Sequence, residues 1–457
     1  MSAWRAEARA QLRLALPVIA VQLGMIGMMV VDVAVVGHHS VRELAGVALG
    51  NSLSFLYCSF GMGALMVLDP LVSQAVGARD EAAIRLALQR GLLLALLLTP
   101  PVAAAIWASD GLLALFEVDP NAIDPANGYM RAIVPGVPAF YGFIALRQTL
   151  QAMHRLRPIL LAVLIANASN LALDLVLVRG AFGLPALGAA GCGLATSINR
   201  WLCLALLVGF AWSELRPYLA RLERAALAAL PLGRMLLLGV PIGAHLGLEI
   251  GGFSIISLWM GRLGESVASA HQIALNLGST SFMVPLAVGM AASVRVGRAI
   301  GAQRPADARS AAWVASAAGM SFMALAALCF YCFPSFFARL YTSDPEVVEL
   351  TARLILIVAA FQVFDGAQAV FAGILRGAGD TRFPILCFLL GFWAVGMPLA
   401  WFWTFRSEAG PEGLYWGLTL GLGLAALLLG MRVRAVMAGS LERVRVDAPS
   451  APNSASS

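Results

Sequence analysis

Long runs of apolar residues, separated by short polar segments, follow one another along almost the whole chain. A helix needs about 20 apolar residues to cross the hydrocarbon core of a bilayer. Twelve runs meet this requirement, so the pattern predicts an all-α membrane protein with twelve transmembrane helices. We place these helices at residues 14–36, 44–72, 86–108, 127–153, 159–178, 186–211, 235–260, 267–293, 310–333, 348–375, 384–404 and 413–431.

The second half of the chain repeats the first at a nearly constant offset. Three matched pairs differ by 224 positions: Pro17 and Pro241, Gly37 and Gly261, Gly77 and Gly301. Two more pairs, Phe140 with Phe361 and Gly188 with Gly410, differ by 221 and 222. Six spans are therefore followed by six related spans, which predicts two pseudo-symmetric lobes about an axis along the membrane normal, with a cavity between them.

This repeat divides the chain into five regions. We predict an N-terminus at 1–13, an N-lobe at 14–211, an inter-lobe linker at 212–234, a C-lobe at 235–435 and a disordered tail at 436–457. The tail is assigned by its polar, Ser-, Pro- and Ala-rich composition.

Composition supports the membrane class and sets the orientation. Of the 457 residues 60% are hydrophobic and only 12% are charged, against about 25% charged in soluble domains. All 31 basic residues are arginine, and with the N-terminus inside, 22 fall in inner loops and tails and seven outside. Arginine concentrates in cytoplasmic loops. We therefore expect a multi-pass bacterial inner-membrane protein with both termini, the linker and the tail in the cytoplasm, and the acidic loop around Asp110, Glu117, Asp119 and Asp124 outside.

Acidic residues inside the spans are the most informative chemical feature. Each costs roughly 2.5–3.5 kcal/mol at mid-bilayer if it is ionised and unpaired. Several such acids are more economically explained by a water-filled cavity that carries a cation or a proton than by structural pairing. One of the acids could instead pair with the intramembrane Arg200. For Asp69, a local helix-breaking role beside Pro70 is an equal alternative. The five acids are Asp32, Asp69, Asp174, Glu249 and Asp365.

Polar and methionine side chains accompany these acids at helical spacing. An amide beside a carboxylate suits a small hard cation or a proton, although polar residues in spans also join helices. Methionine suits a pocket for a bulky apolar cation. The accompanying residues are Asn170 next to Asp174, His245 next to Glu249, Gln362 and Gln368 around Asp365, the stripe Gln272, Asn276 and Ser279, and Met25, Met28 and Met29 near Asp32.

Motifs of the common enzyme classes are missing from the sequence. It contains no GxxxxGK[ST], HExxH or GxSxG pattern, and it has no lysine to complete a P-loop. The six cysteines lie in apolar stretches without paired loop spacing, so we expect no disulfide framework. We expect no enzyme activity, no cofactor, no metal beyond a possible Na⁺ at the acids, and no nucleic-acid partner.

Several segments closely resemble the MATE transporters, the multidrug and toxic compound extrusion family. The resemblance covers residues 10–435 and is most specific in VDVAVVGH, LDPLVSQAVGA, GVPIGAHLGLE and FDGAQAVFAGILRGAGDTRFP. It implies two six-helix lobes and export of organic cations in exchange for Na⁺ or H⁺. We expect small organic cations and the bilayer as partners, and a monomer.

The resemblance also assigns roles to individual residues. The family's coupling acids of spans one, seven and ten fall on Asp32, Glu249 and Asp365. The Asn–Asp pair of some branches falls on Asn170 and Asp174, and the companion in span six falls on Thr196. Both lobes thus carry acids, where family branches tend to emphasise one lobe. Phe361 stands where some members have a tyrosine.

Two other functions are alternatives to drug efflux. A flippase of lipid-linked oligosaccharide, from the wider superfamily, would need cationic residues along its cavity, whereas the candidate lining here is acidic. A membrane-embedded enzyme or scaffold would need a catalytic cluster or a large extramembrane domain. On these grounds the sequence favours a cation-coupled multidrug exporter with one coupling site at Asp32 and Asp174 and another at Glu249 and Asp365.

Overall fold

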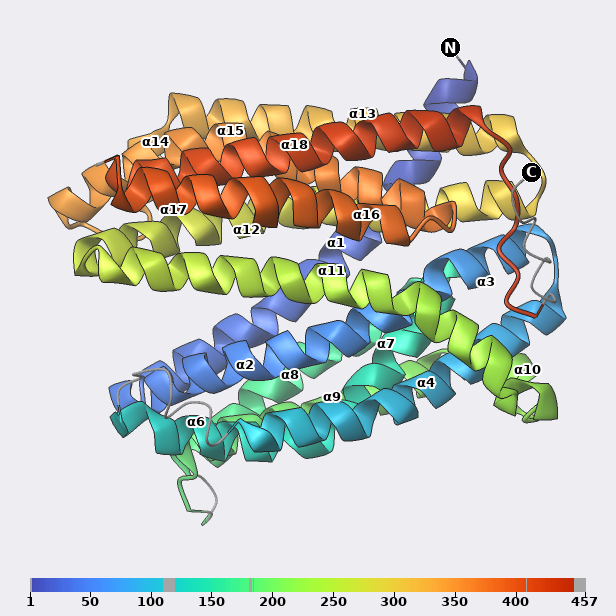
Figure 1. Cartoon of the computed structure of the whole chain (residues 1–457). Helices are drawn as coiled ribbons and strands as arrows, with labels where there is room; N and C mark the ends of the chain where they lie inside the picture. The colour runs from blue at the N-terminus through green and yellow to red at the C-terminus, as the bar shows by residue number, and fades with distance from the viewer. Residues whose placement is uncertain (1, 110–119, 181–182, 184, 408, 448–457) are drawn as a thin grey trace.

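The structure is a computed structural model that describes residues 2–109, 120–180, 183, 185–407 and 409–447. These residues form helices joined by short turns, with no β-strand among them (Figure 1). Twelve spans are long and apolar enough to cross a membrane, which confirms the predicted number. The helices are α1 (Ser2–Gly37), α2 (Val41–Leu65), α3 (Leu68–Gly77), α4 (Glu81–Ala108), α6 (Pro120–Ile133), α7 (Val137–Ala152), α8 (Arg157–Arg179), α9 (Gly188–Phe210), α10 (Trp212–Leu219), α11 (Ala229–Arg262), α12 (Glu265–Gly301), α13 (Pro305–Cys332), α14 (Pro334–Arg339), α15 (Pro345–Gly377), α16 (Arg382–Phe388), α17 (Met397–Phe405) and α18 (Gly410–Ala438).

Most helices extend beyond the predicted hydrophobic spans. α1 begins at Ser2 rather than at 14, and α11 begins at Ala229 rather than at 235. The apolar pattern marks only the part of a helix that lies in hydrocarbon, while the backbone hydrogen bonds continue into the polar ends. The predicted acidic outer loop falls largely on 110–119, outside the described residues; Asp124 lies within α6.

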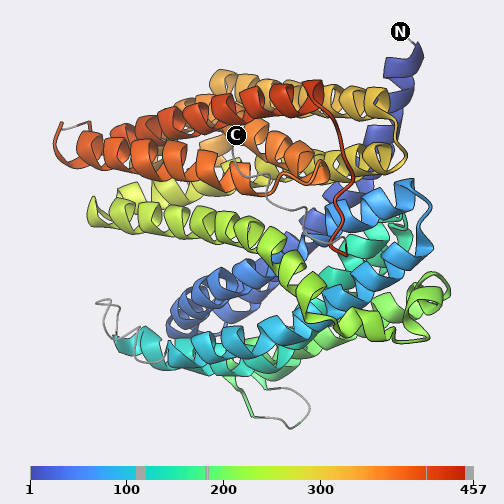
Figure 2. The ribbon, with the colours of Figure 1, turned by 45° about the vertical axis from the view of Figure 1, so that its right-hand side comes forward.

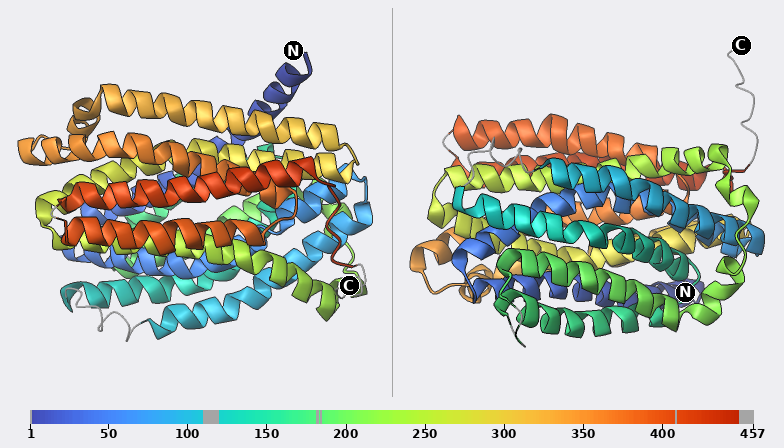
Figure 3. Two further views of the ribbon diagram at one scale, coloured as in Figure 1. Left: turned by 45° about the horizontal axis from the view of Figure 1, so that its top comes forward. Right: turned by 90° about the horizontal axis from the view of Figure 1, so that it is seen from below.

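The helices form two bundles, the N-lobe (α1–α9) and the C-lobe (α11–α18), as Figures 1 and 2 show. Both chain ends and α10 lie at one end of the molecule, which we call the terminal side (Figure 3). The two bundles diverge toward the other end, the opposite side (Figure 2). Helices of the two lobes meet in the pairs α2–α11, α3–α12, α1–α12, α1–α13 and α3–α15.

Close backbone approach holds the crossing of α2 and α11. A Cβ atom added to Gly63 would lie 2.5 Å from the Cα of Gly243, so neither helix has room for a side chain there. Nearer the terminal side, the Gln11 side chain of α1 donates a hydrogen bond to the carbonyl of Val288 in α12 (2.9 Å). These contacts close the seam between the lobes along the terminal half of the molecule.

Two spans depart from a regular helix at positions that matter for the site. The second span breaks at Met66 and Val67, between α2 and α3, just before the Asp69–Pro70 pair. The eleventh span contains a π-helical stretch, Leu389–Gly396, immediately before α17. π-helical stretches in α-helices often occur at functional sites, and this one aligns the rings of Phe388 and Phe392 in a stack (4.7 Å between centroids).

The prediction of a disordered tail is wrong for residues 436–447. α18 continues to Ala438, and the following segment is held by hydrogen bonds to both lobes. Composition failed because the charged side chains at 443 and 447 find fixed partners of opposite sign, Asp80 and Arg90. Residues 448–457 lie outside the described part of the chain.

Candidate functional site

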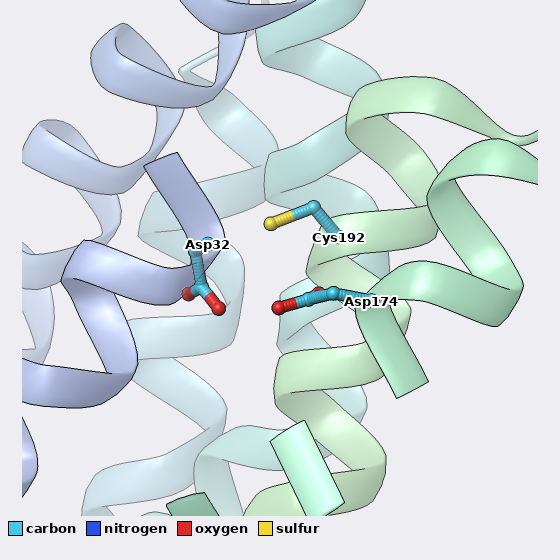
Figure 4. A group of neighbouring side chains, drawn as sticks. All are labelled: Asp32, Asp174 and Cys192. Atoms are coloured by element: carbon cyan, nitrogen blue, oxygen red, sulfur yellow. The ribbon is translucent and has the colours of Figure 1, made fainter. Parts of the chain in front are cut away.

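The N-lobe brings two carboxylates together on neighbouring helices. Asp32 comes from α1 and Asp174 from α8, and Figure 4 shows their side chains pointing toward one another beside Cys192 of α9. The ligand atoms of these three residues lie within 4.8 Å of one another. Asp174 is fully buried and Asp32 is 9% exposed.

Asn170 connects the two acids. Its side-chain nitrogen donates to Asp32 Oδ1 at 2.5 Å and to Asp174 Oδ2 at 2.8 Å. Asn170 lies one helical turn before Asp174 on the same face of α8, so the helix itself positions both groups. Asp174 Oδ1 is buried and accepts no hydrogen bond from any described residue, which leaves one carboxylate oxygen open for a proton or a cation.

A further polar residue that the sequence analysis missed supports this arrangement. Asn199 of α9 donates to Asn170 Oδ1 (3.2 Å) and itself accepts a hydrogen bond from the Ser169 hydroxyl (2.9 Å). It lies three residues after Thr196, so both occupy one face of α9. A search of every span for amides, rather than for acids and their neighbours, would have found it. Thr196 donates to the backbone carbonyl of Cys192 (3.0 Å), within its own helix.

The two carboxylates cannot both be ionised without a strong penalty. Within 4.8 Å of one another, and at an effective dielectric constant near 20, two unit negative charges repel by at least about 3.5 kcal/mol. A shared proton removes that repulsion, and so does a cation bound between the two groups. Carboxylate and amide oxygens suit a hard cation such as Na⁺, whereas the Cys192 sulfur does not. The arrangement can therefore exchange a proton for a small cation.

Neither intramembrane arginine neutralises this pair through an ion pair that the structure describes. The Arg200 guanidinium lies over the Phe140 ring, 4.7 Å from its centroid, and its buried Nη1 has no hydrogen-bond partner among the described residues. Arg147 contacts Gln22 (3.3 Å) and the sulfur of Met25 (3.0 Å). The sequence left open an ion pair between Arg200 and one of the acids, and no such pair occurs among the described residues.

The three methionines of α1 lie in different surroundings. Met25 faces Arg147, and the sulfur of Met28 lies 3.6 Å from the Asn199 side-chain nitrogen. Met29 is 46% exposed on the surface of the molecule. The predicted common face is therefore divided: Met28 reaches the acid site, while Met25 contacts an arginine closer to the terminal side.

The C-lobe holds the second group of acids. Asp365 of α15 is 6% exposed, and the charge of Glu249 in α11 acts on it. Asp365 Oδ1 is buried and has no hydrogen-bond partner among the described residues. This lobe thus also holds two acids that act on one another electrostatically, and no amide among the described residues bridges them.

Neighbouring side chains shape this second group. Gln368 Nε2 lies 3.2 Å from His245 Nε2, and the His245 ring packs against Phe388 of the aromatic stack (4.8 Å). Gln362 accepts a hydrogen bond from the Ser281 hydroxyl (2.8 Å). Phe361, where a tyrosine would offer a hydroxyl, packs edge-on against Phe253 (6.2 Å).

The polar stripe of span eight is not brought to these acids by any contact that the structure describes. Gln272, Asn276 and Ser279 are all exposed on the surface of α12. Asn276 accepts a hydrogen bond from the Tyr341 hydroxyl (2.9 Å), which ties α12 to the segment before α15. Asn276 therefore joins two segments of the C-lobe, which was the alternative role for polar residues in the spans, and it does not contact the acids through any described interaction.

Asp69 has a place of its own, apart from both groups. It is fully buried at the start of α3, and Oδ2 lies 3.3 Å from Arg376 Nε at the end of α15 in the other lobe. The break before Pro70 turns Asp69 toward the C-lobe. The residue is therefore part of the seam on the terminal side and belongs to neither coupling group.

Two repeated bundles of membrane-spanning helices, each with acids inside its spans, define the class: a polytopic membrane transporter. The MatE family profile matches residues 17–176 and again 241–402. The two matches cover well over half of the sequence and begin 241 − 17 = 224 positions apart, which is the offset of the internal repeat. The chain belongs to the MatE family.

Named relatives and solved structures agree with this assignment. The chain is 39% identical over 434 residues to a probable multidrug resistance protein NorM of Bradyrhizobium diazoefficiens, which covers 93% of this chain and 92% of that protein. It is 33% identical over 440 residues to multidrug resistance protein NorM of Vibrio cholerae, covering 95% and 96%. The crystal structure of the eukaryotic MATE transporter AtDTX14 superposes with a TM-score of 0.86 at 22% identity, covering 95% of this chain and 99% of that one.

Proposed function

We propose that the protein is a secondary active multidrug exporter that moves organic cations and related xenobiotics across the bacterial inner membrane in exchange for H⁺ or Na⁺. The observation that carries this proposal is the pair of buried carboxylates, Asp32 and Asp174, joined through Asn170 inside a membrane-spanning lobe. Resemblance to the NorM multidrug resistance proteins supports the cargo class. The flippase alternative gains no support, because both candidate sites are built on carboxylates rather than on cationic side chains.

Exchange follows from the chemistry of the acid pair. A proton or cation that enters between Asp32 and Asp174 removes their repulsion and favours whichever arrangement of α1 and α8 holds the two groups closest. Coupling requires that the ion bind one arrangement more tightly than the other. Glu249 and Asp365 offer a second group of the same kind in the C-lobe.

Transport by the purified protein tests this proposal directly. Proteoliposomes preloaded with a fluorescent organic cation are given a proton gradient, a sodium gradient, or neither, in separate experiments. We expect one gradient to drive uphill movement of the dye and the other to have little effect. Equal dye movement with and without each gradient would contradict coupled antiport.

The cargo itself is the next expectation. Expression in a host that lacks its own efflux pumps should raise the tolerated concentration of several unrelated cationic dyes, because a buried acidic site selects charge more than shape. Growth is measured across dye concentrations, with an Asp32→Asn strain as the negative control. Protection against anionic compounds alone would contradict an acidic cargo pathway.

The orientation is also testable by labelling. Ala306, on the terminal side, and Ser343, on the opposite side, are both exposed. Each is replaced by cysteine in a background whose six native cysteines have been removed. A membrane-impermeant maleimide should label Ser343→Cys in intact cells, and Ala306→Cys only after permeabilisation, if the arginine bias places the terminal side in the cytoplasm. The reverse pattern would invert the topology.

A further inference from the structure

The segment that follows α18 crosses the seam between the lobes instead of leaving the molecule. Residues 440–447, which we call the terminal strap, run from the end of the C-lobe down over the N-lobe on the terminal side (Figures 1 and 2). Nothing in the proposed transport chemistry uses this segment. Its contacts are nevertheless specific, and they involve both lobes.

Three side chains of the N-lobe hold the strap. Arg443 pairs with Asp80, the residue that caps the N-terminus of α4 (3.0 Å). Asp447 accepts two hydrogen bonds from the Arg90 guanidinium of α4, at 2.6 and 2.9 Å. The backbone N–H of Val444 donates to the side-chain oxygen of Gln74 in α3 (2.7 Å).

The same stretch also contacts the C-lobe. Arg234 of α11 donates to the carbonyl of Val446 (2.9 Å). Val444 lies against Gly379, in the turn after α15, where φ is +86° and an added Cβ would fall 2.2 Å from a Val444 methyl group. Gln74, which accepts from Val444, also donates to the carbonyl of Gly377 (3.0 Å), so one fully buried side chain joins α3, α15 and the strap.

Burial separates these contacts from ordinary surface ion pairs. Arg90 is 1% exposed and Val446 is 8% exposed, although Asp447 itself remains accessible. An exposed pair contributes little to stability, whereas a buried guanidinium that loses its partner carries an uncompensated charge. Arg90 retains the carbonyl of Ala225 in the linker (2.9 Å), which lessens the loss when the strap departs. The strap is thus bound specifically and can still be released.

We propose that the terminal strap is a detachable latch that keeps the terminal side of the two lobes closed. It extends across the seam between α3 and α15, where Gln74 contacts both Val444 of the strap and Gly377. The strap can remain bound to both lobes only while this seam is closed. When the lobes part on the terminal side, as alternating access requires, Arg443, Val444 and Asp447 must leave the N-lobe.

A distance measurement across the seam tests the latch. Spin labels are placed at Arg155→Cys in the turn between α7 and α8, and at Ala306→Cys at the start of α13; both positions are exposed and lie on different lobes. A chain ending at Gly439 lacks the strap, and a matched chain ending at Asp447 retains it. We expect the shorter chain to populate a longer inter-label distance severalfold more than the matched chain, which should behave like the full-length protein.

Single substitutions provide a second test if the chain ending at Gly439 does not insert into the membrane. Asp447→Asn removes the charge that faces Arg90, whereas Glu442→Gln makes the same change at an exposed strap position. Only Asp447→Asn should increase the longer-distance population. Equal distance distributions for both variants, or for both truncated chains, would overturn the latch. The inference rests on the alternating opening of the proposed transporter. The spin labels measure the distance between the lobes without cargo or gradient, so the latch can be tested even if the protein does not transport.

Discussion

Replacement of Asp32 by asparagine should strongly reduce gradient-driven export while the protein remains folded and inserted. The substitution keeps the volume of the side chain, and the Asn170 amide can still donate to the remaining oxygen at this position. It removes the charge that a proton or a cation must neutralise. Since coupling free energies are typically 1–3 kcal/mol, we expect uphill transport to fall by roughly 5- to 150-fold.

Asp307→Asn is the matched control for this change. Asp307 is an acid on the surface of the C-lobe helix α13 with a 60% exposed side chain, whereas the acid pair lies in the N-lobe. Initial rates of dye accumulation in proteoliposomes are compared at equal amounts of folded protein, judged by thermal unfolding. Asp174→Asn should match Asp32→Asn, and the double variant should be no worse than either, because the two acids act as one site. Wild-type rates in both single variants would make the pair structural.

Replacement of Glu249 by glutamine should have the second large effect. Glu249 and Asp365 are the two intramembrane acids of the C-lobe, and their like charges repel one another when both are ionised. Glu249→Gln removes that repulsion without removing volume, so we expect gradient-driven export to drop by about the same 5- to 150-fold factor. Gradient-driven transport and binding of the fluorescent cation are measured on the same preparation.

Binding separates two roles for the C-lobe acids. If Glu249→Gln binds the dye normally and loses only uphill transport, the C-lobe acids bind the coupling ion. If dye binding falls in parallel, they hold the cargo and the N-lobe alone couples. Gln272→Ala, at an exposed position of α12, is the control and should leave both measurements unchanged. Wild-type transport by Glu249→Gln would show that the C-lobe acids take no part.

The sequence was sufficient for the helices and for the individual acids, because both leave a local signature. Apolar runs of span length and isolated carboxylates within them can be read residue by residue. The i, i+4 spacing of Asn170 and Asp174 also placed two groups on one face before any tertiary structure was known. That Asp32 approaches this face depends on how α1 packs on α8, which the sequence pattern does not encode.

Contacts between distant segments account for what was missed. Asn199 became part of the site only when α9 packed beside α8, and Arg376 reached Asp69 only when α15 met α3. The polar composition of the strap predicted disorder. Its charged side chains nevertheless bind the buried Arg90 and the helix-capping Asp80, both more than 350 positions earlier in the chain. Composition describes how a segment interacts with water and cannot register a specific partner elsewhere.

The repeat that relates the lobes does not relate their acids, and this has an evolutionary consequence. At the offsets of the repeat, Asp32 corresponds to Ile256 and Glu249 to Met25. Asp174 corresponds to Gly396, and Asp365 to Ile144. Each of these four acids thus has an apolar or glycine counterpart in the other half. If the halves arose by duplication, the two copies kept a common architecture while their acids diverged. A protein built from two copies of one half would therefore lack one set of acids and carry the other set twice.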